Sequence, residues 1–128
     1  MNAAEDPPLR KTRHAAYRGY LYLAWKLESP GNRDLRADGE RFREAVEAAC
    51  RERDISIERF AAWKTSLHLL CSLPHRHSPA SLLDALKERT SRILGGEPWA
   101  EGGLLNTVSH RAREEALQAM KEPAGVRV

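Results

Sequence analysis

The chain has 128 residues, of which 41% are hydrophobic and 30% charged, with a formal net charge of +3 and an isoelectric point near 9.1. This balance indicates one globular domain and excludes a disordered chain. No apolar run is long enough to cross a bilayer, and the first 14 residues lack the apolar centre of a secretory signal, so we expect a cytoplasmic protein without a membrane partner. Cys50 and Cys71 have no CxxC spacing and predict buried thiols.

The first half of the chain predicts an arm, a strand and a helix. Residues 1–14 combine Pro7-Pro8 with basic side chains and show no periodicity, so we expect a flexible basic arm. Residues 17–27 alternate, which predicts a strand with one apolar face made of Leu21, Leu23, Trp25 and Leu27. After a loop over residues 29–37, Asp38 is the expected N-cap of a helix. Its apolar stripe is Phe42, Ala45, Val46, Ala49 and Cys50.

The second half predicts three strands and two helices. Residues 55–64 and 66–73 read as strands joined near Thr65. In the second of them, one face carries Leu67, Leu69, Cys71 and Leu73, and the other carries Ser66, His68, Leu70 and Ser72. Ser78-Pro79 begins a helix that continues to about Leu94, where Gly95-Gly96 ends it. A strand over residues 103–109, a helix over residues 111–121 and a mobile tail over residues 123–128 complete the chain.

The order of these elements predicts an α+β fold. It is the ferredoxin-like β-α-β-β-α-β sandwich, with an antiparallel sheet and an added C-terminal helix. Two helices would cover the sheet face that carries Leu67, so the face of Ser66 and His68 would be open or would meet a partner. The expected division is an arm over residues 1–14, a domain over residues 15–122 and the tail over residues 123–128.

The central segment, WKTSLHLLCSLPHRHSPASLLDALKERTSRIL, resembles a known family. It is similar to the small single-strand HUH tyrosine transposases of bacterial insertion sequences and their repeat-associated relatives. Their pattern is Met-Pro-Asp/Asn-His-hydrophobic-His-Leu-Leu, followed by a helix that starts with a Ser-Pro-like pair. Leu67 to Leu70, Ser78-Pro79 and Leu82 to Leu94 carry the match. The similarity extends over about residues 15–122, and it implies the domain named above.

The resemblance implies a chemistry from which this chain departs. In the family, two strand histidines bind a divalent metal and a C-terminal tyrosine forms a 5′-phosphotyrosine link with single-stranded DNA. Here the histidine positions are Ser66 and His68, the tyrosine position falls at about Ala119, and a third-ligand position falls at about Pro123. Residues 100–128 contain no tyrosine. The sequence therefore predicts no tyrosine-mediated cleavage, and it predicts bound Mg or Mn only where residual activity at His68 remains.

The partner expected from the resemblance is hairpin or single-stranded DNA, bound by a homodimer. Basic clusters supply the candidate phosphate contacts, which are Arg10, Lys11, Arg13, Lys64, Lys87, Arg89 and Arg92. Two alternatives stay open: a residual metal-dependent nuclease that uses His68, and a structural or protein-binding dimer that binds no nucleic acid.

Several side chains have a structural interpretation beside the functional one. His68 is interpreted first as a polar residue on the open sheet face or at a dimer interface, because one histidine rarely holds a metal alone. Tyr20 and Tyr22 could stack bases or only pack. Trp63 and Trp99 favour core or interface positions. Ser66 as a nucleophile would need His68 and an acid that orients it, and no such acid is evident.

Overall fold

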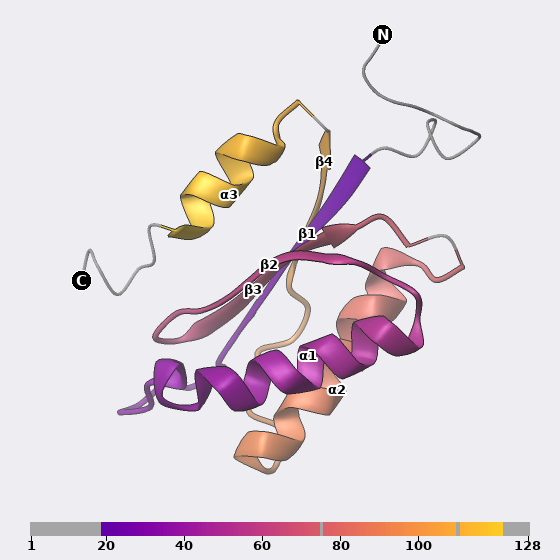
Figure 1. Ribbon diagram of the computed structural model, residues 1–128. Coiled ribbons are helices and arrows are strands. Elements are labelled where there is room, and N and C mark those ends of the chain that lie inside the picture. Colours follow the sequence, from indigo (N-terminus) through magenta and orange to yellow (C-terminus); the bar gives the residue numbers. More distant parts are fainter. Residues whose placement is uncertain (1–18, 75, 110, 122–128) are drawn as a thin grey trace, which may run out of the picture.

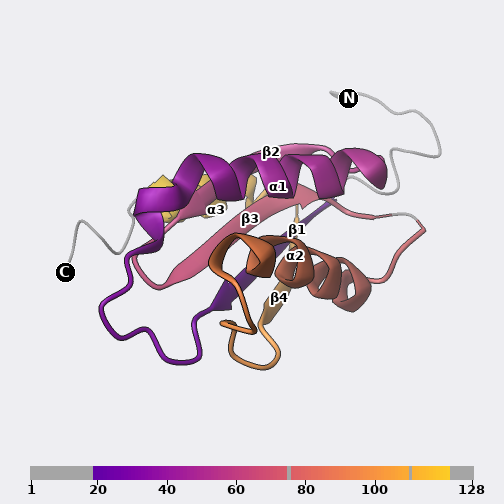
Figure 2. The same ribbon diagram turned by 90° about the horizontal axis from the view of Figure 1, so that it is seen from below.

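The computed structural model describes residues 19–74, 76–109 and 111–121, which are arranged in three layers (Figure 1). Helices α1 (Gly39–Glu52) and α2 (Pro79–Leu94) lie side by side under one face of a sheet, as Figure 2 shows from below. Helix α3 (Arg113–Lys121) lies on the other face. The α+β, ferredoxin-like expectation is confirmed. The expected arm over residues 1–14 and tail over residues 123–128 lie outside the described residues, so the domain division stays a prediction.

The described residues form a four-stranded antiparallel sheet with the strand order β2-β3-β1-β4. Its strands are β1 (Gly19–Lys26), β2 (Ile57–Ala62), β3 (Ser66–Ser72) and β4 (Leu104–Ser109). Residues 63–65 join β2 to β3 in a tight turn, where the Trp63 N–H donates to the Ser66 carbonyl at 2.8 Å. Because β1 and β3 are the inner strands, each is paired along both of its edges.

Alternation in β1 and β3 correctly predicted which side chains enter the core. Leu23 lies opposite Leu69 in the register, and both are fully buried. They pack between the sheet and the apolar stripes of α1 and α2. Each large side chain buried in this way stabilises the fold by roughly 2 kcal/mol. Cys50 and Cys71 are free, buried thiols, as expected.

The predicted strand ends ran too far in several places. β2 begins at Ile57 rather than residue 55, because the chain leaves α1 through Asp54, whose φ of 60° belongs to a turn. Asp38 precedes α1 but makes no side-chain capping bond. Instead a 3₁₀ turn, η2 (Leu35–Asp38), enters the helix, and the Asp34 carboxylate caps it by accepting from the Arg36 N–H. The loop expected over residues 29–37 therefore already contains helical turns.

The start of α2 matches its sequence signals. The Ser78 side chain accepts a hydrogen bond from the Ser81 N–H at 3.0 Å, and Pro79 occupies the first turn, where no backbone N–H is needed. Gly95 follows the last turn with a φ of 85°. These signals are local, so they could be recognised without knowledge of the tertiary structure.

The loop over residues 95–103 closes the end of the sheet beside β1. Trp99 packs edge-on against Trp25, with ring centroids 6.4 Å apart, and also contacts Phe42. Trp99 is half-buried and packs against the core, in agreement with the expectation of a core or interface position. Gly103, at the start of β4, has a φ of 157° and lies so close to β1 that a Cβ there would be 2.9 Å from the Ala24 carbonyl oxygen. Only glycine fits this position.

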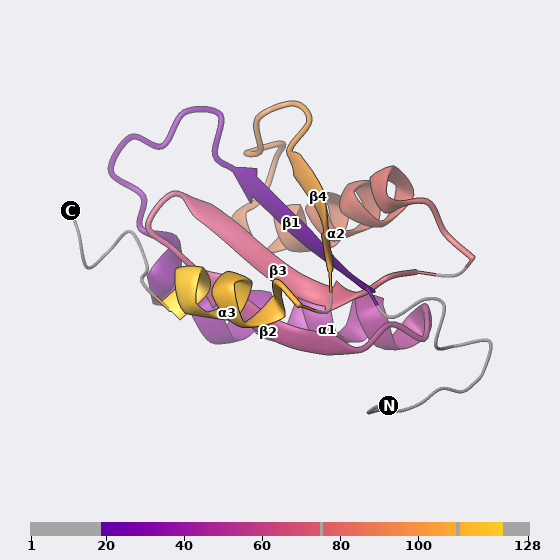
Figure 3. The same cartoon turned by 90° about the horizontal axis from the view of Figure 1, so that it is seen from above.

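The second face of the sheet is partly covered. In Figure 3, α3 lies along β2 and β3 and leaves most of β1 and β4 uncovered. Met120 of α3 is buried, with 2% of its surface exposed. No helix in the described part of the chain is both long and apolar enough to span a membrane.

Candidate functional site

The candidate site lies at His68, in the middle of β3 on the face toward α3. The imidazole is buried, with 6% of the residue exposed. Its Nδ1 lies 2.5 Å from the Tyr22 hydroxyl and its Nε2 lies 2.8 Å from the Ser66 hydroxyl. The Trp63 ring lies against it, with ring centroids 3.7 Å apart and planes inclined by 30°. We call Ser66, His68 and Tyr22 the His68 row.

The sheet register explains how the row forms. His68 lies opposite Ala24 of β1 and Ala61 of β2, so two small neighbours leave room for the larger side chains placed diagonally. Tyr22 is one of these diagonal neighbours, and it reaches the imidazole from β1. The expectation that the Ser66 and His68 face is open or meets a partner is wrong at His68, because Tyr22 and Trp63 of the same chain bury its ring.

Burial determines the charge of the row. It lowers the pKa of His68 to about 4 and raises the pKa of Tyr22. Both groups are therefore neutral at pH 7. A neutral imidazole donates from one nitrogen and accepts at the other, and the two hydroxyls can serve either need. The row thus satisfies every polar atom of a buried histidine without a charge.

The arrangement does not fit a divalent metal site. A metal ligand needs a free nitrogen lone pair, whereas both nitrogens of His68 already contact hydroxyl groups. Among the described residues, no group of three or more His, Cys, Asp or Glu side chains is placed to hold a metal ion. Ala119, at the expected tyrosine position, is exposed on α3 and carries no hydroxyl.

Ser66 and His68 are in hydrogen-bond contact, which raises the question of a serine nucleophile. Such a dyad needs a basic imidazole and an acid that orients it. Here the other nitrogen of His68 contacts the Tyr22 hydroxyl rather than a carboxylate, and the low pKa makes His68 a weak base. The contact between Ser66 and His68 therefore has a structural role. Among the residues that the structure describes, the basic imidazole and the orienting carboxylate that a hydrolytic site needs are not found beside it.

The three basic residues predicted on α2 point in different directions. The Lys87 ammonium donates to the carbonyls of Ala100 and Gly102, at 2.8 and 2.7 Å. Arg89 pairs with Glu52 of α1 at 2.6 Å. Arg92 pairs with Glu88 of its own helix, and its side chain is 66% exposed. They do not form one continuous basic surface.

The remaining predicted contacts are placed differently. Lys64 is exposed at the turn between β2 and β3. Arg10, Lys11 and Arg13 lie outside the described residues. The role of all these side chains in nucleic-acid binding stays a prediction.

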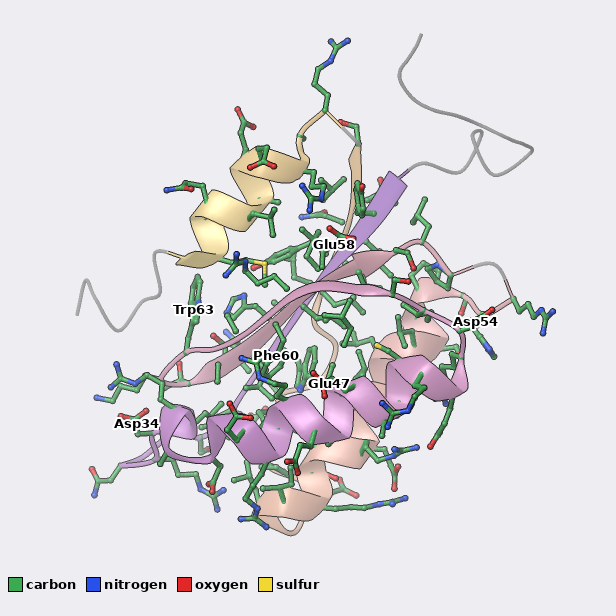
Figure 4. The ribbon with its side chains drawn as sticks, viewed as in Figure 1. Asp34, Glu47, Asp54, Glu58, Phe60 and Trp63 are labelled. Atoms are coloured by element: carbon green, nitrogen blue, oxygen red, sulfur yellow. The ribbon has the colours of Figure 1, made fainter. Side chains whose placement is uncertain are left out.

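Arg113 anchors α3 on the sheet. Its guanidinium pairs with Glu58 of β2 at 2.6 Å and lies over the Tyr20 ring, 5.8 Å from the centroid. Figure 4 shows Glu58 and Trp63 on the α3 side of the sheet, and Phe60 on the α1 side. Tyr20 and Tyr22, considered above as base-stacking residues, thus contact Arg113 and His68 of the same chain.

A cavity of about 450 Å³ opens beside the His68 row, at the ends of β1 and β3 and the start of β4. Its lining includes Ala24, Lys26, Ser66, Glu101, Gly103 and Leu104. Sequence reasoning did not select Lys26 or Glu101. The alternation of β1 places Lys26 on the face of Ala24, but the loop that completes the cavity follows almost 80 residues later and could not be positioned from spacing alone.

The strand order and the positions of the helices are similar to those of two solved transposase structures. A solved REP-associated tyrosine transposase bound to a REP hairpin superposes with a TM-score of 0.69 at 13% identity, over 95% of this chain and 72% of that one. A candidate transposase from Deinococcus radiodurans R1 superposes with a TM-score of 0.54 at 19% identity, over 81% and 88%. No protein-family model and no curated protein matches the sequence. The resemblance is confirmed at the level of the fold.

Replacing Lys87 by Met should lower the free energy of unfolding by about 2 kcal/mol, because two carbonyls lose a charged donor. Arg92→Met on the same helix is the control, and it should change stability by less than about 0.5 kcal/mol, since its ion pair is exposed. Urea denaturation measures both. Equal effects of the two substitutions would show that the hydrogen bonds from Lys87 to the loop carbonyls do not stabilise the fold.

His68 should make the protein less stable in mild acid. The pKa of His68 is about 4 in the folded protein, and its ordinary value is 6.5. Between these two pH values the unfolded chain binds a proton at His68 and the folded protein does not, so acid favours unfolding. The contribution of neutral His68 to the free energy of unfolding is complete above pH 6.5. It is lost as the pH falls toward 4, and the total loss is about 3 kcal/mol.

Denaturation of wild type and His68→Gln over this pH range isolates the effect, since other groups titrate in both. A proton NMR titration of the His68 ring in the wild type gives a second reading. A titration midpoint above pH 6 would show that the ring is not buried as described.

Proposed function

We propose that this protein binds a DNA hairpin, or the single-stranded DNA beside it, on a transposase scaffold without cutting it. The observation that carries the proposal is the superposition on a REP-associated tyrosine transposase whose structure is bound to a REP hairpin. The match extends over 95% of this chain and 72% of that one, and this shared fold supports a similar kind of partner.

The absence of cleavage is supported by the residues at the positions that the family chemistry needs. Ser66 replaces the first histidine, and both nitrogens of His68 contact hydroxyls. Residues 100–128 contain no tyrosine, and the tyrosines of the chain lie between residues 17 and 22. We therefore place binding before the alternative of a residual nuclease, and we propose that function needs no Mg or Mn. A reducing cytoplasm fits Cys50 and Cys71, which are free thiols in the core.

Electrostatics supports an anionic partner. The chain has a net charge of +3, and Arg10, Lys11 and Arg13 concentrate positive charge before β1. Lys64 is exposed, and Arg92 is exposed although it pairs with Glu88. Arg89 keeps further N–H donors beyond its pair with Glu52, whereas Lys87 has two of its three donors engaged. The arm is thus the first candidate for phosphate contacts.

Titration of the purified chain with a single-stranded DNA hairpin, a matched duplex and single-stranded RNA, each at two salt concentrations, tests the proposal. We expect the hairpin to bind most tightly. Changing Arg10, Lys11 and Arg13 together to Ala should weaken binding and flatten the salt dependence, by about 0.7 in logarithmic slope for each lost contact to a single strand. Denaturing electrophoresis with Mg or Mn should show no covalent adduct.

The control for the arm is an equal loss of charge on α1, where Arg41, Arg43 and Arg51 lie on the opposite side of the sheet from His68. This triple Ala variant should bind the hairpin almost as the wild type does. Absence of binding to all three nucleic acids would overturn the proposal and favour a structural dimer. A covalent adduct would overturn the loss of cleavage.

We further propose that the protein is a homodimer joined through β4. This strand is at the edge of the sheet, paired with β1 only, and most of its side chains are exposed. Such an edge can pair with the same strand of a second copy. Sedimentation velocity should show a dimer at tens of micromolar protein. Thr107→Lys, which would place two lysines close together near the centre of the joint, should give a monomer. A wild-type chain that stays monomeric at every concentration would contradict this joint.

A further inference from the structure

The cavity beside the His68 row is unlike the rest of the surface. Leu104 is 47% exposed, and it is the one large hydrophobic side chain that is exposed among the described residues. It lies in the wall of this cavity together with Ala24. The cavity is lined by the last residues of β1, the first residues of β3 and β4, and the loop that precedes β4. An apolar surface of this kind, reachable from solvent and bordered by polar groups, is typical of a ligand site.

Three polar side chains border the apolar wall. Lys26 lies directly opposite Ser66 in the pairing of β1 and β3, on the same face as Ala24, and its ammonium group is exposed. The Ser66 hydroxyl contacts His68 Nε2 and keeps lone pairs for one further donor. Glu101 adds a carboxylate from the loop. The cavity thus offers an apolar wall, the ammonium of Lys26, and two hydrogen-bond acceptors on Ser66 and Glu101.

The wall formed by the loop is fixed before any ligand arrives. Lys87 holds the carbonyls of Ala100 and Gly102, and the Ala100 N–H donates to the Lys26 carbonyl at 2.8 Å. Gly103 packs directly on β1, where a side chain would collide. A site that is already ordered loses little conformational entropy on binding.

We propose that this cavity receives one unpaired base of single-stranded DNA. The base lies against Leu104 and Ala24, Lys26 contacts an adjoining phosphate, and an exocyclic amino group of the base donates to Glu101 or Ser66. This inference rests on the DNA binding proposed above and names where one nucleotide is read. Phosphate alone would be disfavoured by the Glu101 carboxylate, and a base inside a duplex could not enter. The volume of about 450 Å³ suits a single nucleotide.

Abasic scanning tests the pocket. In the hairpin that binds best, each unpaired base is removed in turn and the dissociation constant is measured. Removal at one position should weaken binding about tenfold, a moderate value for a base that packs on a protein side chain. Thymine at that position keeps the packing surface but lacks an exocyclic amino group, so it should bind more weakly than adenine or cytosine and more tightly than the abasic site.

Leu104→Gln and Lys26→Met identify the cavity as the place where that base binds. Each should weaken binding of the intact hairpin about five- to tenfold and should have little effect on the hairpin that is abasic at the sensitive position. Arg41→Met, on α1 at the far side of the sheet, is the matched control for Lys26→Met and should leave both affinities unchanged. Thermal unfolding confirms that the variants are folded, which their exposed positions favour.

The outcomes separate this inference from the proposed function. If the hairpin binds but no unpaired base matters, or if the two substitutions weaken both hairpins equally, the pocket is wrong and DNA binding stands. If free dCMP or dAMP binds with a dependence on Leu104 while hairpin binding has none, the cavity is a nucleotide site and the inference is overturned. If no DNA binds, both proposals fail.

Discussion

β3 is buried on both of its faces, and this burial restricts which groups can lie beside it. Toward α1 and α2 it presents aliphatic side chains and a thiol. On the other face it carries His68, a polar group that would be costly to bury without partners. Ser66 and Tyr22 supply those partners, and Trp63 covers the ring. The same contacts that make the histidine tolerable inside the protein also occupy the nitrogens that a metal would need.

The position of α3 divides the outer face of the sheet into two halves. Over β2 and β3, the pair of Arg113 and Glu58 and the buried Met120 hold the helix close. Over most of β1 and β4 no helix of the described residues covers the face, and Leu104 is exposed there. The His68 row lies at the boundary between the two halves. The chemistry expected of the family would have been centred on this boundary, whereas the accessible surface of this chain lies beside it.

Local signals predicted much of the fold. Alternation placed Leu23 and Leu69 in the core, and the Ser78-Pro79 pair correctly marked the start of α2. The contact of Tyr22 with His68 could not be predicted, because it depends on the register between strands that are more than 40 residues apart. Lys87 was assigned to phosphate from its charge alone. Which carbonyls a long side chain reaches depends on the path of a loop, and spacing along a helix carries no information about that path.

The order of strands in the sheet differs from their order along the chain, and this has a consequence for synthesis. β1 is made first, yet its partners β3 and β4 end only at Ser72 and Ser109. During synthesis β1, with its Leu21, Leu23 and Trp25 side chains, has no partner strand until β3 has been made. In contrast, β2 and β3 are adjacent in the chain and can form their hairpin as soon as both are made. The nascent chain therefore carries an apolar, unpaired strand while α1 and β2 are synthesised. The addition of β4 along the free edge of β1 is the last step that completes the sheet.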